Sequence, residues 1–306
     1  MTRVIYSEVR ETALDRRKSG QKLSITGVLC ILGLSKSGYY DFCKRKPSAS
    51  HVWKENVMER IMKIHNESHK IYGAPKITKK LRETGNVISE RTVGLYMKEL
   101  GIRAHYVKPR TQTTINSDFS EELKNILDER FDPDEPNAYW CTDITYIYTS
   151  EGFVYLCSIM DLYSRKIVAW TLSKTLEAKY VVETVYKAIN ARGSRPKVIH
   201  SDRGSQYTSI GYERITEGMQ RSYSKKSYPW DNACIESFHS LIKREWLNRY
   251  KISDYRHAYR LVFEYIDAFY NTQRIHSHCK YKTPAEHERA YYERTAINSE
   301  AIPNFV

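Results

Sequence analysis

Three acidic residues stand at positions where strands and helices direct a side chain toward one point: Asp143, Asp202 and Glu236. Asp143 lies inside the apolar strand pattern AYWCTDITYIYT (138–149), and Asp202 ends the short apolar stretch PKVIHSD (196–202). Glu236 lies on a predicted helix within PWDNACIESFHSLIKRE (229–245). Taken singly, these residues are an edge-strand Asp, a turn-forming Asp and a solvated helical Glu. Only the combination of the three indicates a site.

Three carboxylates from two strands and one helix suit a hard, oxygen-seeking cation. Mg²⁺ binds through one or two carboxylates, keeps several waters and accepts a substrate phosphate as a further ligand. Two such ions about 4 Å apart activate the attacking oxygen and stabilise the leaving oxygen of a phosphodiester. We therefore expect two Mg²⁺ ions, for which Mn²⁺ can substitute, at Asp143, Asp202 and Glu236. A zinc site would need more His or Cys ligands.

The helix that carries Glu236 has two adjacent stripes at helical spacing. The apolar stripe consists of Ile235, Phe238, Ile242 and Trp246. The polar stripe consists of Asn232, Glu236, His239 and Lys243. Because the polar stripe borders the apolar contact, we expect Glu236 to lie near the domain surface and still face the strands.

Alternating strand and helix patterns must position these residues. Strands are predicted at 138–149, 152–162 and 165–173, followed by an amphipathic helix at 175–193 that ends at Gly193. A buried strand at 196–202, a helix near 209–219 and a strand near 221–224 precede the helix of Glu236. This order predicts a mixed-sheet α/β domain, and the Tyr- and His-rich tail from about 253 to 293 is predicted to be helical.

Short helices with turn signals fill the N-terminal third. Residues 23–45 predict two helices broken at Gly33, and residues 53–69, 73–85 and 89–101 predict three more. The pair at 73–101, with Pro75 in its first turn and Ser89 as N-cap, is the better helix-turn-helix candidate. Its basic side chains are expected to contact DNA phosphates, although such helices can also be solvated faces: Lys76, Lys79, Lys80, Arg91 and Lys98.

The positive charge of the chain is confined to this N-terminal third. Residues 1–110 hold 23 Lys and Arg against 10 Asp and Glu, a net charge of +13, which is the net charge of the whole chain. Residues 111–306 hold 26 of each kind and are neutral. A basic segment beside a balanced one favours a polyanionic partner such as nucleic acid.

These patterns divide the chain into five predicted segments. We expect a short helical segment at 1–50, a helix-turn-helix domain at 51–110, a linker at 111–136 with one helix near 119–130, a catalytic core at 137–250 and a helical tail at 251–306. The six cysteines form no CxxC pair and are typical of small core residues in a reducing compartment. With no signal-like segment and no 18-residue apolar run, we expect a cytoplasmic protein without a membrane segment.

Three motifs, in this order, carry a resemblance to a known family: CTDITYI, VIHSDRGSQYTS and WDNACIESFHSLIKRE. They resemble the core of a DDE transposase with a retroviral-integrase-type, ribonuclease-H-like fold, and more narrowly the B-frame product of bacterial insertion sequences of the IS-three family. GNVISERTVGLYMKELGI (85–102) resembles that family's helix-turn-helix, and YNTQRIHSHCKYKTPAEHE (270–288) resembles its C-terminal signature. The resemblance covers residues 53–288.

The resemblance implies a role for several matched residues. Asp143, Asp202 and Glu236 correspond to the metal-binding triad, and Lys243 to a basic residue near the transposon-end DNA. Residues within the matched motifs are expected to line the site: Arg203, Gln206 and Asn232. Arg274 and His276 fall in the tail signature without a role that their chemistry suggests.

The resemblance also implies partners and a reaction. The expected partner is double-stranded DNA, as terminal inverted repeats and as target, bound by a homo-oligomer that bridges two ends. A circular or branched DNA intermediate and a frameshifted fusion with an upstream A-frame protein are implied as well. The expected reaction is metal-dependent cleavage and transfer of DNA strands. Two alternatives stay open: a ribonuclease-H-type nuclease that only hydrolyses, and a DNA-binding regulator whose α/β domain is inert.

One spacing departs from the family. Residues 203–235, 33 in number, separate Asp202 from Glu236, which is two residues shorter than usual for such transposases. A shorter loop before SYPWDNA would absorb the difference. A shifted helix register would instead move Glu236 out of the triad.

Overall fold

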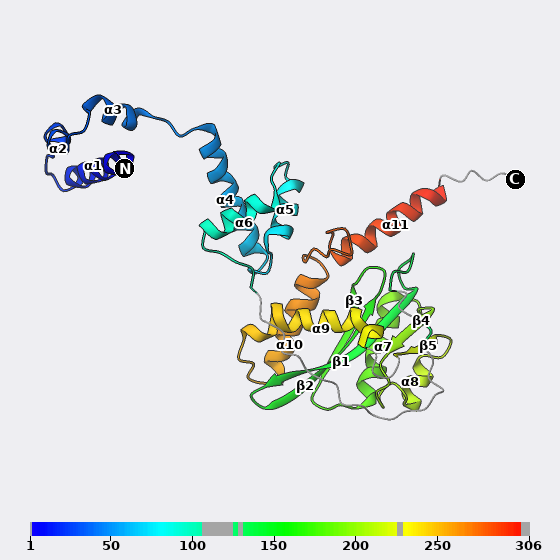
Figure 1. The fold of residues 1–306 in the computed structure, drawn as a ribbon. Coiled ribbons are helices and arrows are strands. Elements are labelled where there is room, and N and C mark those ends of the chain that lie inside the picture. Colours follow the sequence, from blue (N-terminus) through cyan, green and yellow to red (C-terminus); the bar gives the residue numbers. More distant parts are fainter. Residues whose placement is uncertain (1, 106–124, 128–130, 225–228, 301–306) are drawn as a thin grey trace. The chain divides into compact units, whose positions relative to one another are not determined.

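The computed structural model describes residues 2–105, 125–127, 131–224 and 229–300 (Figure 1). The chain divides into two compact units, Met1–Arg60 and Ile61–Val306. The helix predicted near 119–130 lies almost entirely outside the described residues, and residues 125–127 are not helical. The division into five segments at residues 50, 110, 136 and 250 stays a prediction.

The first unit contains three helices around a small core: α1 (Thr2–Lys18), α2 (Ile25–Ile31) and α3 (Lys36–Lys44). Serine hydroxyls cap the two short helices, since Ser24 accepts from the N–H of Gly27 and Ser35 from that of Gly38. The predicted break at Gly33 is confirmed, with a backbone φ of +65° that favours glycine. The core consists of Tyr6, Val9, Leu29 and Tyr39.

The predicted helix-turn-helix segment is helical as expected. It contains α4 (Ala49–Glu67), which begins in the first unit, α5 (Ala74–Glu83) and α6 (Glu90–Glu99). Pro75 lies in the first turn of α5, and Ser89 caps α6 by accepting from the N–H of Thr92. Buried apolar side chains from the three helices form its core: Ile61, Ile77, Leu81 and Val93.

The second unit also contains a five-stranded mixed sheet. Its strands are β1 (Tyr139–Thr149), β2 (Gly152–Asp161), β3 (Ile167–Ser173), β4 (Val198–Ser201) and β5 (Gln220–Tyr223). They lie in the order β3-β2-β1-β4-β5. The first three strands pair antiparallel, while β4 pairs parallel with both β1 and β5. The predicted mixed-sheet α/β core is therefore confirmed.

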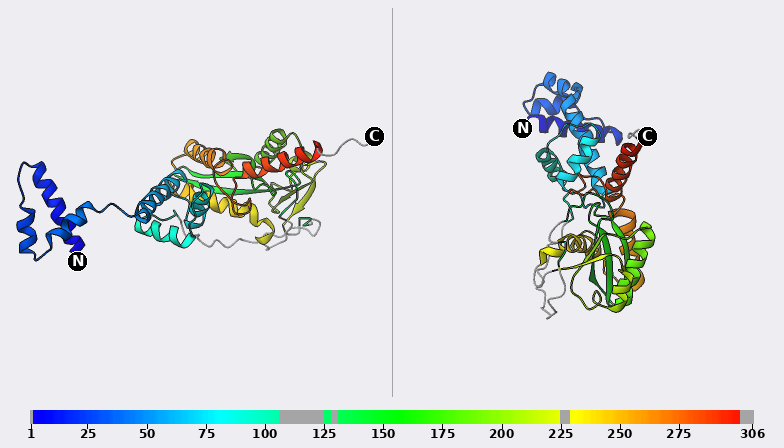
Figure 2. Two further views of the ribbon diagram at one scale, coloured as in Figure 1. Left: turned by 90° about the horizontal axis from the view of Figure 1, so that it is seen from above. Right: turned by 90° about the vertical axis from the view of Figure 1, so that its right-hand side faces the viewer.

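Helices cover both faces of the sheet (Figure 2). On one face lie α7 (Ala178–Arg192) and α8 (Ile210–Ile215), whose apolar side chains form a buried core with Trp140, Ile159 and Ile199. On the other face α9 (Ala233–Glu245) packs against β1 and β2. None of the described helices is long and apolar enough to cross a membrane.

The tail is helical, as predicted. A 3₁₀ turn (Leu247–Arg249), α10 (Tyr255–Phe263), a π-helix (Glu264–Tyr270) and α11 (Pro284–Glu300) follow one another. Asn271, at the end of the π-helix, binds edge strand β3 twice: its Oδ1 accepts from the N–H of Ile167 (3.0 Å) and its Nδ2 donates to the carbonyl of Ile167 (3.0 Å). Glu288 binds Lys166 and Arg192 at the same edge. The tail thereby satisfies polar groups of the sheet.

Replacing Asn271 tests this attachment. Asn271→Ala leaves both backbone groups of Ile167 without a partner in a buried place, so we expect a loss of about 2–4 kcal/mol in the free energy of unfolding. Urea unfolding followed by circular dichroism measures it. The control Asn190→Ala, on the exposed side of α7, should change stability by less than about 0.5 kcal/mol. Equal stability of the two variants would contradict the attachment.

Candidate functional site

Asp143 lies on β1, immediately beyond the stretch that pairs with β4. The pairing with β4 covers Tyr139, Trp140 and Cys141, with Cys141 opposite His200. Two residues further along the same parallel register, Asp143 is level with Asp202, which follows the last residue of β4. Neighbouring strands lie about 4.8 Å apart. The sheet register itself therefore brings these two carboxylates to one place.

A tight loop holds Asp202. Its Oδ1 accepts a hydrogen bond from the N–H of Gly204 (2.9 Å). A Cβ on Gly204 would lie 2.9 Å from Oε1 of Gln206 and 3.1 Å from Oδ1 of Asp202, so a larger residue would displace the carboxylate. Although much of the residue faces solvent, partial desolvation and the charge of Asp143 raise the pKa of Asp202 to about 6.

Glu236 lies on α9, and its side chain is exposed. The predicted apolar stripe of this helix is buried against the rest of the core: Ile235, Phe238, Ile242 and Trp246. Desolvation, then the charges of Asp143 and Asp202, raise the pKa of Glu236. The charges of Asp143 and Asp202 therefore act on Glu236, and its place in a metal-binding triad despite the shorter spacing stays a prediction. Residues 225–228 of that spacing lie outside the described residues.

The side chains of Asp143, Asp202 and Glu236 are not arranged to coordinate one metal ion in this structure. Among the described residues, no three His, Cys, Asp or Glu side chains lie close enough together to hold a metal ion. The donor types nevertheless fit a divalent cation, because carboxylate oxygens are the ligands that Mg²⁺ prefers. Desolvation, and then the charges of neighbouring carboxylates, raise the pKa of Asp202 and of Glu236. The metal-binding role of the triad stays a prediction.

His239, on the polar stripe of α9, contacts Asp143 directly. Its Nδ1 donates to Oδ2 of Asp143 (3.2 Å), and its Nε2 lies 3.4 Å from Oγ of Ser158, the residue opposite Asp143 on β2. His239 is buried, with 5% of its surface exposed, whereas Glu236 on the same stripe is exposed. The helical spacing alone places His239 on the polar stripe but indicates no role for it. Its position one turn after Glu236 was the only available signal.

Lys243 lies at the rim of the acidic site. Its Nζ is 4.5 Å from the ring centroid of Tyr146, a cation–π contact. Burial lowers the pKa of Lys243, and the charge of Asp143 opposes that effect. A positive group beside three carboxylates can meet a phosphate that approaches them.

The other residues expected to line the site make internal contacts. Nε of Arg203 donates to the carbonyl of Ser224 (2.8 Å), and Nε2 of Gln206 donates to that of Leu176 (3.3 Å). Asn232 is buried, and its Oδ1 has no hydrogen-bond partner in the part of the chain that the structure describes. Their contacts to DNA stay predictions.

The basic residues of the helix-turn-helix segment fall into two groups. Lys79, Arg91 and Lys98 are exposed, and the half-buried Lys80 forms an ion pair with Glu83 (3.2 Å). Lys76 differs, because its Nζ lies over the ring of Tyr72, 5.0 Å from the centroid. Burial and the charge of Arg274 lower the pKa of Lys76 to about 7. Lys76 is therefore half-buried against Tyr72, unlike the exposed Lys79 and Lys98, and its contact to DNA stays a prediction.

Comparisons with known proteins identify two kinds of domain in this chain. Residues 53–110 match the family described as HTH-like domain, and residues 133–229 and 217–284 match two families described as Integrase core domain. The structure of the HTLV-2 integrase catalytic core domain in complex with magnesium aligns at 17% identity and a TM-score of 0.41, covering 51% of this chain and 98% of that one.

Curated relatives match over most of the chain. The transposase for insertion sequence element IS904 of Lactococcus lactis subsp. lactis (strain IL1403) is 36% identical over 248 residues, covering 80% of this chain and 98% of the relative. The transposase InsF for insertion sequence IS3A of Escherichia coli (strain K12) is 30% identical over 277 residues, covering 89% and 96%. The resemblance read from the three motifs is thereby confirmed, and the chain belongs to the IS3 family of insertion-sequence transposases.

Proposed function

We propose that this chain catalyses metal-dependent cleavage and transfer of DNA strands at the ends of an insertion sequence. The observation that supports the proposal is the parallel register that sets Asp143 level with Asp202, in a chain whose residues 133–229 match the family described as Integrase core domain. No nucleophilic Ser or Tyr is needed, because the attacking group is water or a DNA 3′-hydroxyl.

The three carboxylates would hold the divalent cations, Mg²⁺ or Mn²⁺, two ions in all. When bound, such ions lower the pKa of the attacking water or hydroxyl and offset the charge on the leaving oxygen. The protein supplies the acidic oxygens, and His239 orients Asp143 by holding its Oδ2. Lys243 would attract the phosphate of the DNA end to the rim of the site.

The exposed basic side chains of the HTH-like domain would bind the terminal inverted repeats. Lys79, Arg91 and Lys98 are free to reach phosphates in solvent, which supplies affinity, while base-edge contacts supply specificity. Target DNA, a homo-oligomer that bridges two ends, and fusion with or binding to an A-frame protein complete the proposed assembly. Its place of action is the bacterial cytoplasm, on the nucleoid.

Asp143→Asn tests the catalytic proposal. The variant keeps the shape of the side chain but loses its charge, so we expect a loss of at least about a hundredfold in end cleavage with unchanged DNA affinity. Purified protein, labelled element ends and Mg²⁺ give nicked and joined products on a gel. The control is Asp134→Asn, at an exposed position outside the site. Undiminished cleavage in Asp143→Asn would favour the inert-domain alternative, and nicks without joints would favour the nuclease.

The stability of the metal-free protein should depend on Asp202. The pKa of Asp202 is raised to about 6, so the folded protein is destabilised by this carboxylate above pH 6 and relieved of that effect as protons bind below it. Asp202→Asn should therefore melt at a higher temperature than the native chain at pH 7.5 in EDTA. The difference should shrink as the pH falls below 6 and vanish only below about pH 4, where this carboxyl is protonated in the unfolded chain as well. Added Mg²⁺ should raise the melting temperature of the native chain only. A pH-independent difference would argue against the shared acidic site.

His239 should control metal affinity through Asp143. His239→Ala frees Oδ2 of Asp143, and loss of such an orienting partner weakens metal binding by about 10–100-fold. His239→Asn keeps a nitrogen donor near the position of Nδ1 and should restore most of the affinity. The Mg²⁺ concentration that half-saturates the shift in melting temperature measures the effect without any turnover. Equal affinity in all three proteins would remove the orienting role.

A further inference from the structure

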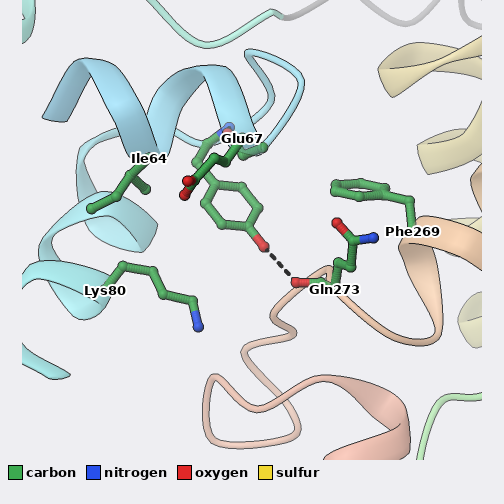
Figure 3. A pocket seen from close by; sticks show the side chains of 7 residues that line it. Ile64, Glu67, Lys80, Phe269 and Gln273 are labelled. Atoms are coloured by element: carbon green, nitrogen blue, oxygen red, sulfur yellow. Dashed lines mark hydrogen bonds between the residues drawn. The ribbon is translucent and has the colours of Figure 1, made fainter. Parts of the chain in front are cut away.

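Tyr72, in the connection between α4 and α5, joins the HTH-like domain to the tail. Its hydroxyl donates to the carbonyl of Gln273 (3.1 Å) and accepts from the N–H of Ile275 (2.9 Å), as Figure 3 shows for the first of these bonds. Tyr72 is buried, with 4% of its surface exposed. One hydroxyl thus bridges two backbone groups on either side of Arg274, about two hundred residues further along the chain.

Arg274 continues the connection to the helix that carries Glu236. Its Nε and Nη2 donate to the two carboxylate oxygens of Glu245 (2.7 and 2.6 Å), the last residue of α9, and Tyr265 also donates to Oε2 (2.7 Å). Both members of the ion pair are buried. Although burial opposes the charged form of Glu245, the hydrogen bond from Arg274 lowers its pKa. A buried pair with this many hydrogen bonds fixes one geometry.

Ring contacts border the hydrogen bonds. His69 lies edge-on to Trp246 and to Phe269, at centroid distances of 4.9 and 5.2 Å. A pocket of about 180 Å³ opens beside Tyr72, lined also by Ile64 and Gln273 (Figure 3). Because the surfaces are not sealed by a continuous apolar core, the attachment depends on its hydrogen bonds and ring contacts.

These contacts define a docking seat on the core, made of Glu245, Trp246, Phe269, Gln273, Arg274 and Ile275. We propose that the tail signature serves as the seat of the HTH-like domain and fixes that domain relative to α9, so that a bound DNA end meets the acidic site at a set distance. Tyr72, Lys76 and Arg274 are positioning residues in this scheme, which rests on the function proposed above.

Helix geometry gives the scale of the coupling. Glu245 follows Glu236 by nine residues on one uninterrupted helix, so the seat lies about 14 Å along the axis from the acidic site. That length corresponds to about four base-pair steps of duplex DNA. A change in the orientation of the HTH-like domain at this distance would therefore shift the bound DNA end relative to the carboxylates.

A variant of Lys76 distinguishes a positioning role for this residue from direct binding to DNA phosphates. It lies over Tyr72, close to Arg274 and Glu245, whereas Lys98 is exposed on α6. Lys98→Met should reduce the slope of log affinity against log salt by about 1, as loss of one phosphate contact does. Lys76→Met should leave that slope unchanged and lower cleavage. An equal loss of slope in Lys76→Met would make Lys76 a phosphate contact and overturn its place in the seat.

Tyr72→Phe is the central test, because it removes two hydrogen bonds and keeps the ring. We expect the affinity for a single element end to stay within about twofold, the cleavage rate to fall at least about tenfold, and the cut to spread to neighbouring phosphodiesters. Tyr186→Phe, at an exposed position on α7, is the matched control. Unchanged rate and cut position in Tyr72→Phe would overturn the proposal, as would a loss confined to affinity.

A measurement without DNA distinguishes failure of the seat from failure of the proposed function. Hydrogen exchange of residues 65–76 should accelerate in Tyr72→Phe and in Arg274→Gln but not in Tyr186→Phe, at matched melting temperature. If the native chain cleaves no ends while the exchange rates change as expected, the function fails and the seat stands. If exchange in this segment is unaffected, the seat itself is wrong.

Discussion

Repulsion among three carboxylates is the constraint on which the rest of the core depends. Asp143 and Asp202 are level with each other because β4 runs parallel to β1 and leaves it after Cys141. Glu236 is added by a helix whose apolar side chains are buried. Desolvation and the neighbouring like charges both oppose ionisation, and together they raise the pKa of Asp202 and of Glu236. The surrounding contacts must therefore be strong enough to hold the acids together.

Those contacts come from neighbouring elements and act on one carboxylate each. His239 holds an oxygen of Asp143, and the N–H of Gly204 holds one of Asp202. Neither partner surrounds the acids completely, so carboxylate oxygens stay available to a cation. The same logic applies at the other end of α9, where Glu245 is neutralised by Arg274 and does not add to the repulsion. Helix α9 thus carries Glu236, whose carboxylate is available to bind a cation, and Glu245, whose carboxylate is neutralised by an ion pair with Arg274.

Most helices and strands could be predicted from the sequence, because helix caps, glycine breaks and apolar spacing depend only on neighbouring residues. Ser35 and Ser89 cap helices where expected, and the breaks at Gly33 and Gly193 have left-handed backbone that suits glycine. The acidic site was predictable for a different reason: Asp143, Asp202 and Glu236 lie in motifs matched by a known family. Their proximity could not follow from spacing alone, since it depends on the parallel register of β1 and β4.

Partners distant in sequence escaped prediction. A helical stripe shows that His239 and Glu236 share a side of α9 but not that this side faces Ser158 and Asp143. Lys76 was counted among the DNA-contacting charges, and composition cannot tell a lysine in solvent from one over the ring of Tyr72. The net charge of the N-terminal third therefore overstates the charge available to phosphates.

The tail signature gains a physical explanation from these long-range contacts. Asn271 completes the backbone hydrogen bonding of the sheet edge, and Arg274 neutralises the end of α9. Both are polar residues that look functional in a sequence, and both are buried with their hydrogen bonds made inside the protein. The polar residues of the tail signature therefore have a structural role. They connect the sheet, the helix of Glu236 and the HTH-like domain through hydrogen bonds that few other side chains could make.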